Sequence, residues 1–123
     1  QSRLLRKRGI FMPHDASKYL WDAQHAAELA MGFVSGMERA EFLTNELVQA
    51  AVERKLEIVG EALNKLRRFF PEVAAEIPAL GQAVGMRNIL AHEYGSVNPL
   101  MVWDTVTNHV PVLLKLLVEP EPD

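Results

Sequence analysis

One row of apolar residues runs through the middle of this chain and constrains its fold more than any other feature. The row steps by three or four residues at a time, through Val48, Val52, Leu56, Val59, Leu63, Leu66 and Phe70. That spacing matches the 3.6-residue period of an α-helix and not the two-residue period of a strand. We predict a helix from about Glu41 to Phe70, ended by Pro71. A helix with one apolar face must bury that face, which indicates other helices around it.

Helical spacing recurs on both sides of this segment. Asp15 is a suitable N-cap for a first helix that runs to about Ser35, and Gly36 is expected to end it. A short helical turn is predicted at Glu72–Glu76. A further substantial helix is predicted at roughly Ala79–His92.

The last helix is expected to begin at Asn98-Pro99, a pair typical of an N-cap and a first helical residue. Its apolar face is formed by Trp103, Val106, Val110, Leu113 and Leu117. Pro111 interrupts the pattern, removes the hydrogen bond to the Thr107 carbonyl and should kink the helix. Because strand signals are nearly absent, we predict an all-α, four- to five-helix up-and-down bundle with short connections.

The composition fits one folded domain. Of the 123 residues, 49% are hydrophobic, which argues against disorder. We assign residues 13–118 to the bundle, residues 1–12 to an N-terminal extension or cloning remnant, and residues 119–123 to a loose tail. The absence of cysteine excludes disulfides and thiolate metal sites and fits a reducing, cytoplasmic location. No apolar run approaches the roughly 20 residues of a membrane span.

The charge is placed unevenly along the chain. Four of the 13 basic residues lie within the first eight positions, whereas the chain holds 16 acidic residues in total. The body is therefore acidic. A protein that coats nucleic acid usually presents a basic face, so any RNA contact should be local or helped by a second subunit.

The segment Arg87-Asn88-Ile89-Leu90-Ala91-His92-Glu93-Tyr94 gathers chemically useful side chains near a helix end. An arginine can neutralise phosphoryl oxygens, and a histidine can move protons near neutral pH. Together they could act on a phosphodiester without a metal. The alternative is a surface arginine and a capping histidine in the last helical turn.

Two further groups on the predicted helices have more than one interpretation. Gly60 lies in mid-helix, where glycine costs about 1 kcal/mol relative to alanine, so either another helix approaches closely or a long helix tolerates it. Arg54, Glu57 and Glu61 share one side of that helix, and we interpret them as an intrahelical ion pair with an exposed acid. The alternative is that one of them supports the site around Arg87 and His92. Asp22 and His25 would be a weak metal pair, so no metal and no cofactor are expected.

Several of these elements together resemble HepT-like proteins, the HEPN-domain toxins of MntA–HepT type toxin–antitoxin modules. The resemblance runs from about residue 19 to 117. It is carried by Tyr19-Leu20-x-Asp22, Phe33-Val34-x-Gly36, Ala51-Val52-x-Arg54-x-Leu56-Glu57-Ile58-Val59-Gly60-Glu61-Ala62, Pro71, Pro78, Met86-Arg87-Asn88-x-Leu90-x-His92-x-Tyr94, Val102-Trp103 and Pro111.

This resemblance implies a HEPN-like bundle that forms a homodimer, with the Arg–His motifs of both subunits lining one cleft. It implies metal-independent endoribonuclease activity on an RNA substrate. It also implies a nucleotidyltransferase antitoxin as partner, which would transfer AMP to Tyr94. One departure is Gly95, where many members of the family have an aromatic residue.

The mechanism that we expect uses His92 as general base on the ribose 2′-hydroxyl and Arg87 to stabilise the developing phosphorane. Asn88 and Tyr94 would support them. The products would carry 2′,3′-cyclic phosphate ends. Arg87 and His92 lie about 140° apart around an ideal helix. They can therefore converge only if the helix ends or distorts near His92, or if a second subunit supplies one of them.

A different class of function also fits the sequence. The chain could be a non-catalytic helical module that docks and regulates a nucleotidyltransferase, and its acidic body favours this alternative somewhat. A metal-binding carboxylate bundle is a weaker third interpretation.

Overall fold

The computed structural model describes residues 14–78, 80–92 and 97–118, apart from the side chains of positions 14, 88–92 and 118. Within these ranges every regular element is helical, which confirms the predicted all-α bundle. The elements are α2 (His14–Phe33), α3 (Arg39–Leu43), α4 (Glu46–Phe69), α5 (Pro71–Ala74), α6 (Leu80–His92), α7 (Pro99–Asp104), the π-helical segment η1 (Thr105–His109) and α8 (Val110–Val118).

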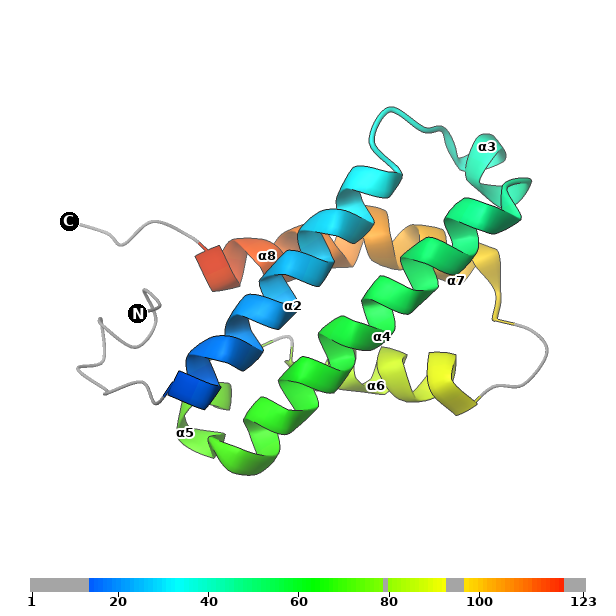
Figure 1. Ribbon diagram of the computed structural model, residues 1–123. Coiled ribbons are helices and arrows are strands. Elements are labelled where there is room, and N and C mark those ends of the chain that lie inside the picture. The colour runs from blue at the N-terminus through cyan, green and yellow to red at the C-terminus, as the bar shows by residue number, and fades with distance from the viewer. Residues whose placement is uncertain (1–13, 79, 93–96, 119–123) are drawn as a thin grey trace.

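Helix α4 lies at the centre of the bundle (Figure 1). It packs against α2 on one side and α6 on another, while α7, η1 and α8 form one long line behind them. The predicted apolar row is confirmed, since its middle members are buried and its two ends, Val48 and Phe70, are partly buried. The largest fully buried side chains include Phe42, Leu63 and Leu66. The row thus holds the bundle together from α4 outwards.

The predicted start of the central helix is wrong, because the chain breaks before Glu46. Asn45 is the N-cap of α4, and its side chain accepts a hydrogen bond of 3.1 Å from the backbone N–H of Val48. The residues before it form the separate short helix α3, opened by a capping box between Glu38 and Glu41. Local hydrogen bonding of Asn45 therefore outweighs helical propensity at this point.

The ends of the other helices follow the predictions with small shifts. Helix α2 ends at Phe33, and the turn after it reaches Gly36, whose φ of +75° only glycine adopts easily. Asp15 lies in the first turn of α2 and is not its N-cap. Pro71 stops α4 and opens α5 at its first position. The predicted extension 1–12 and tail 119–123 lie outside the described residues.

The last helix distorts ahead of Pro111, in the form of a π-helical segment. Asn98 caps α7 as predicted and accepts from the backbone N–H of Leu100 at 2.9 Å. In η1 the backbone N–H of Val110 reaches the carbonyl of Thr105, five residues back. This wider turn absorbs the proline, which cannot continue the regular hydrogen-bond ladder.

None of the helices in the described part of the chain is both long and apolar enough to cross a membrane.

Candidate functional site

Helix α6 carries three of the four residues singled out in the sequence. Arg87, Asn88 and His92 all lie in this helix, and His92 is its last residue. The Arg87 side chain is partly buried. The side chains of Asn88 and His92 and the whole of Tyr94 lie outside the described residues. The convergence of these four groups therefore stays a prediction.

The backbone of α6 nevertheless fixes the relation between positions 87 and 92. Both lie inside one helix, so they are separated by about 140° around its axis. The first route to convergence, an end or distortion of the helix near His92, stays open, because α6 ends at His92. A contribution from a second subunit keeps its geometric motivation.

Helix α6 crosses α4 at the point where Arg87 lies directly over Gly60. A Cβ atom placed on Gly60 would overlap the Cβ of Arg87 and would lie 2.8 Å from its Cγ and 2.9 Å from the carbonyl oxygen of Ala83. Real Cβ atoms essentially never come within 3.0 Å of such neighbours. The close approach considered for Gly60 is thus confirmed, and the approaching helix belongs to the same chain.

This crossing buries part of Arg87. Its Nε atom is inaccessible to solvent, while the residue as a whole is only partly covered. Leu80 and Val84 anchor the same face of α6 in the core, and Met86 packs against the core from its edge. The start of the Arg87 side chain is therefore held between two helices.

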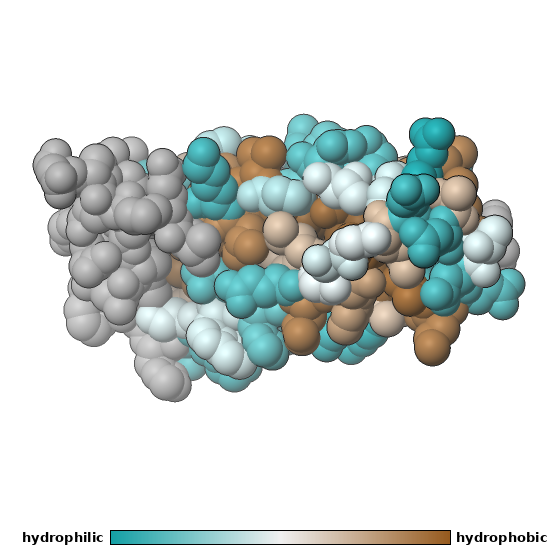
Figure 2. Space-filling view, turned by 90° about the horizontal axis from the view of Figure 1, so that it is seen from above, coloured by the Kyte–Doolittle hydropathy of each residue, from teal (hydrophilic) through white to brown (hydrophobic). Residues whose placement is uncertain are grey.

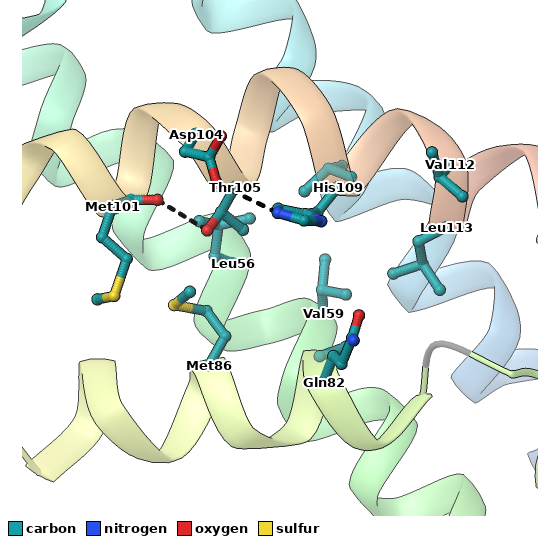
Figure 3. Close-up of a pocket in the computed structure, with 12 residues that line it drawn as sticks. Leu56, Val59, Gln82, Met86, Met101, Asp104, Thr105, His109, Val112 and Leu113 are labelled. Carbon is teal, nitrogen blue, oxygen red and sulfur yellow. Dashed lines mark hydrogen bonds and ion pairs between the residues drawn. The ribbon is translucent and has the colours of Figure 1, made fainter.

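A neighbouring flank of α6 is open. A groove of about 390 Å³ separates α6 from the line of α7, η1 and α8 (Figure 3). Leu56 and Val59 of α4 form its floor. Its walls are formed by Gln82, Ala83 and Met86 from α6 and by Met101, Asp104, Thr105, His109, Val110, Val112 and Leu113 from the other side.

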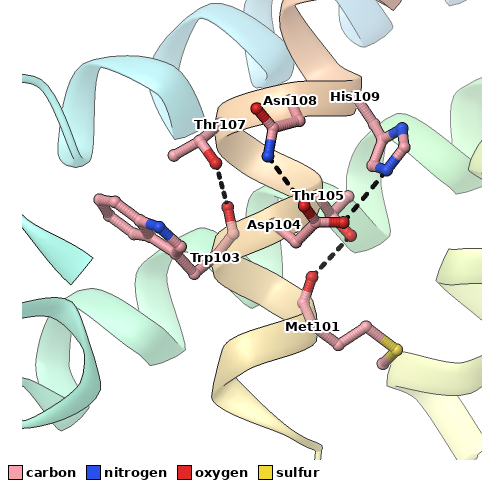
Figure 4. Close-up of polar contacts among 7 residues, drawn as sticks. All are labelled: Met101, Trp103, Asp104, Thr105, Thr107, Asn108 and His109. Atoms are coloured by element: carbon pink, nitrogen blue, oxygen red, sulfur yellow. Dashed lines mark hydrogen bonds and ion pairs between the residues drawn. The ribbon is translucent and has the colours of Figure 1, made fainter. Parts of the chain in front are cut away.

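The π-helical turn aligns an acid and a histidine on the wall of this groove (Figure 4). Asp104 accepts from Asn108 Nδ2 at 2.8 Å and pairs with His109 Nε2 at 3.2 Å. Residues five apart lie on different sides of an α-helix, but a π-helical turn brings them together. Thr105 and Thr107 donate their hydroxyl hydrogens to the Met101 and Trp103 carbonyls, at 2.8 and 2.7 Å.

From the sequence, no role was expected for His109, and Asp104 and Gln82 were not singled out. Two threonines shortly before Pro111 were the available signal, since threonine hydroxyls that bond to the preceding turn often bend helices. The groove itself had no signal in the sequence, because its lining comes from three separate segments.

The polar side of α4 behaves as interpreted from the sequence. Arg54 pairs with Glu57 at 3.0 Å and approaches Glu61 at 3.7 Å. Burial, and to a smaller extent the charge of Glu57, raises the pKa of Glu53 above its usual range. Glu53, Glu57 and Glu61 therefore form an acidic stripe along α4, in which Arg54 is the paired cation.

Asp22 and His25, considered above as a weak metal pair, interact with other residues. Asp22 pairs with Lys18 at 2.9 Å, an interaction that raises the pKa of the lysine, and His25 stacks on Trp21 with ring centroids 4.7 Å apart. Among the described side chains, no group of three or more His, Cys, Asp or Glu could hold a metal ion.

One face of the molecule is a mosaic of hydrophilic and hydrophobic side chains, without a single broad patch of either kind (Figure 2). Its exposed apolar residues are therefore scattered, as on most soluble surfaces, and do not mark a site.

Comparison with known proteins found one matching family and several relatives. Residues 23–119 match the model of a family described as ribonuclease HepT-like. A protein of Thermococcus cleftensis named "Probable ribonuclease HepT" is 35% identical over 102 residues, which cover 83% of this chain and 92% of that protein.

Further relatives carry the name "Putative RNase", among them one from Methanocaldococcus jannaschii and one from Caldanaerobacter subterraneus subsp. tengcongensis. The one from Methanocaldococcus jannaschii is 33% identical over 101 residues, 82% of this chain and 92% of its own. The one from Caldanaerobacter subterraneus subsp. tengcongensis is 33% identical over 101 residues, 82% of this chain and 89% of its own. No solved structure gives a significant match.

Proposed function

This chain belongs to the ribonuclease HepT-like family, and from that premise we propose that it is a metal-independent endoribonuclease with its active site on α6. The family description and the names of the relatives support ribonuclease activity. The observation that carries the assignment to α6 is the placement of Arg87. Its stem is wedged against α4 at Gly60, whereas its helix is open on the groove side.

In the proposed reaction, His92 removes the proton from a ribose 2′-hydroxyl. The 2′-oxygen attacks the adjacent phosphorus, and the bond to the 5′-oxygen of the next nucleotide breaks. That oxygen leaves and takes up a proton. Arg87 stabilises the negative charge that develops on the phosphoryl oxygens, because its guanidinium matches their geometry. Asn88 and Tyr94 assist by hydrogen bonding. The products carry a 2′,3′-cyclic phosphate and a 5′-hydroxyl.

The active form is proposed to be a homodimer. Positions 87 and 92 are separated by about 140° around the axis of α6, so one copy of the helix does not place them on one side. A two-fold axis next to α6 would bring Arg87 of one subunit to His92 of the other. The same arrangement places a second Arg87 in the shared cleft, which adds a cation for binding phosphate.

We also propose that this activity is that of a toxin in a toxin–antitoxin module. A nucleotidyltransferase antitoxin would transfer AMP from ATP to Tyr94, releasing pyrophosphate. The added nucleotide brings bulk and a negative phosphate next to Arg87, which would exclude RNA from the cleft.

The test is incubation of purified protein with total RNA in the presence of a chelator. Wild type should cleave and should leave 2′,3′-cyclic phosphate ends, whereas Arg87→Ala and His92→Ala should leave the RNA intact. Fragments with 5′-phosphate and 3′-hydroxyl ends would contradict this chemistry. Mass spectrometry after treatment with the antitoxin and ATP locates the AMP.

A second candidate function is a non-catalytic module that docks and regulates a nucleotidyltransferase. The acidic stripe on α4 favours it, because a negative surface disfavours RNA. Expression without the partner separates the two. A ribonuclease toxin arrests growth of the host and loses that effect in His92→Ala, whereas a docking module has no such effect.

A further inference from the structure

We propose that Gly60 is the positioning residue of the site and fixes the guanidinium of Arg87 for catalysis. This inference rests on the proposed function, since it assigns a role in RNA cleavage. It concerns a residue on α4, a different helix from the one that carries the motif. Gly60 would act without touching RNA, by leaving room for the Arg87 stem.

The fit at this position is steric and leaves little freedom. Three atoms of α6 occupy the space that a side chain at position 60 would need: the Cβ and Cγ of Arg87 and the carbonyl oxygen of Ala83. One of them belongs to the backbone, which cannot rotate away as a flexible side chain can. A methyl group at position 60 therefore has to push α6 outwards.

Helix α6 has support on one side only, so it would yield to that push. It packs extensively on α4 but makes few contacts with α7, η1 or α8, from which the groove separates it. Helix α4, in contrast, is held by fully buried residues on both sides of Gly60, such as Val52 and Leu63. The outward shift would therefore fall on α6 and carry Arg87 with it.

The other glycines described on α6 show that this crowding is specific to Gly60. A Cβ atom on Gly81 or Gly85 would meet nothing within 4 Å. The contact with α6 thus requires glycine at position 60, whereas Gly81 and Gly85 have room for a side chain. The Arg87 side chain is confined between two helices and its Nε is buried. The guanidinium therefore has fewer orientations available before RNA binds.

The experiment compares Gly60→Ala with Gly85→Ala as its matched control and Gly32→Ala as a control away from α6. All three exchange hydrogen for methyl in a helix, but only the first methyl meets α6. We expect Gly60→Ala to lower kcat about 100-fold with little change in KM, as a displacement of about 1 Å would. Both controls should retain the wild-type values.

A double-variant cycle shows whether Gly60 acts through Arg87. If it does, Gly60→Ala adds little further loss to Arg87→Ala, because the group to be positioned is already absent. Losses that multiply in the double variant would overturn the proposal. All assays are done at a temperature at which circular dichroism shows each variant to be folded.

A second readout does not depend on cleavage. The Nε–H of Arg87 should give a resonance that exchanges slowly with water, identified by its absence in Arg87→Lys. Gly60→Ala should shift it and speed its exchange, while Gly85→Ala should not. An unchanged resonance together with unchanged kcat in Gly60→Ala overturns the positioning role and leaves the ribonuclease intact. If wild type itself does not cleave RNA, the proposed function fails, and the catalytic role of Gly60 fails with it.

Discussion

The two sides of α6 differ in how closely they are packed. On the α4 side, the stem of Arg87 lies so near Gly60 that no side chain fits between them. On the side of α7, η1 and α8, a groove of about 390 Å³ separates the helices. The same short helix thus belongs to the core on one face and borders an open space on the other.

This difference gives the candidate site on α6 one closely packed face and one open face. The tight side sets the position of the motif helix, and the open side leaves room for a ligand or a second chain. Sites on rigid elements keep their geometry better than sites on loops.

The largest effect is expected at Arg87 itself. Arg87→Ala should lower kcat for RNA cleavage by about 100- to 1,000-fold, because a stabiliser of the developing charge is lost. Arg87→Lys should retain only part of the kcat that Arg87→Ala loses, since an ammonium group cannot bind two phosphoryl oxygens side by side. Steady-state kinetics on a short RNA measure both. Full activity of Arg87→Ala would remove Arg87 from the mechanism.

Core packing around α4 should give the next largest effect. Leu63→Ala removes a fully buried side chain and should lower the free energy of unfolding by about 2–5 kcal/mol. Val112→Ala, on the groove wall and 58% exposed, should change it by less than about 0.5 kcal/mol. Urea denaturation compares the two. Similar losses for both would mean that the groove is closed in solution.

A smaller, pH-dependent effect is expected at Glu53. Its pKa is raised by burial, so the folded state binds its proton more tightly than the unfolded state does. The contribution of this group to stability is therefore present at low pH and is lost as the pH rises through the folded pKa, above about 4.5.

Glu53→Gln should accordingly make the protein more stable at neutral pH and reduce the loss of stability between pH 4 and 7, relative to wild type. Thermal unfolding across that range measures it. The exposed Glu72→Gln serves as control. A wild-type protein whose stability rises through this range as steeply as that of the Glu53 variant would contradict the raised pKa.

The smallest effect should come from the pair on the groove wall. Asp104 and His109 are each about 60% exposed, so their interaction should contribute about 0.2–1 kcal/mol at most. A double-variant cycle with Asp104→Ala and His109→Ala measures it by urea denaturation. A larger coupling would indicate that the π-helical turn depends on this pair.

Most of the fold could be predicted from the sequence, whereas for the candidate site the sequence indicated single residues and not their neighbours. The apolar row from Val48 to Phe70 fixed the central helix, because its period has one structural solution. The break at Asn45 was missed, since an asparagine inside a strong helical pattern gives little sign of acting as a cap. The cap at Asn98 was visible because Pro99 follows it.

At the candidate site, the local pattern singled out residues by their chemistry but did not show what surrounds them. Arg87 and His92 could be singled out because their chemistry is recognisable in eight residues. The contact of Gly60 with Arg87 joins residues 27 positions apart, and the groove joins three segments of the chain. Such neighbours depend on how the helices cross, which no local period specifies.

Subunit mixing tests most directly whether Arg87 and His92 serve one scissile phosphate across a dimer. The Arg87→Ala and His92→Ala subunits, each expected to be inactive alone, are co-expressed with different tags. If the subunits pair at random, half of the dimers are mixed. In the proposed arrangement, each mixed dimer has one cleft in which both residues are intact. We expect about a quarter of wild-type cleavage to return, as two-fold symmetry requires. If wild type cleaves RNA and the mixture stays inactive, the two residues do not meet across the subunits.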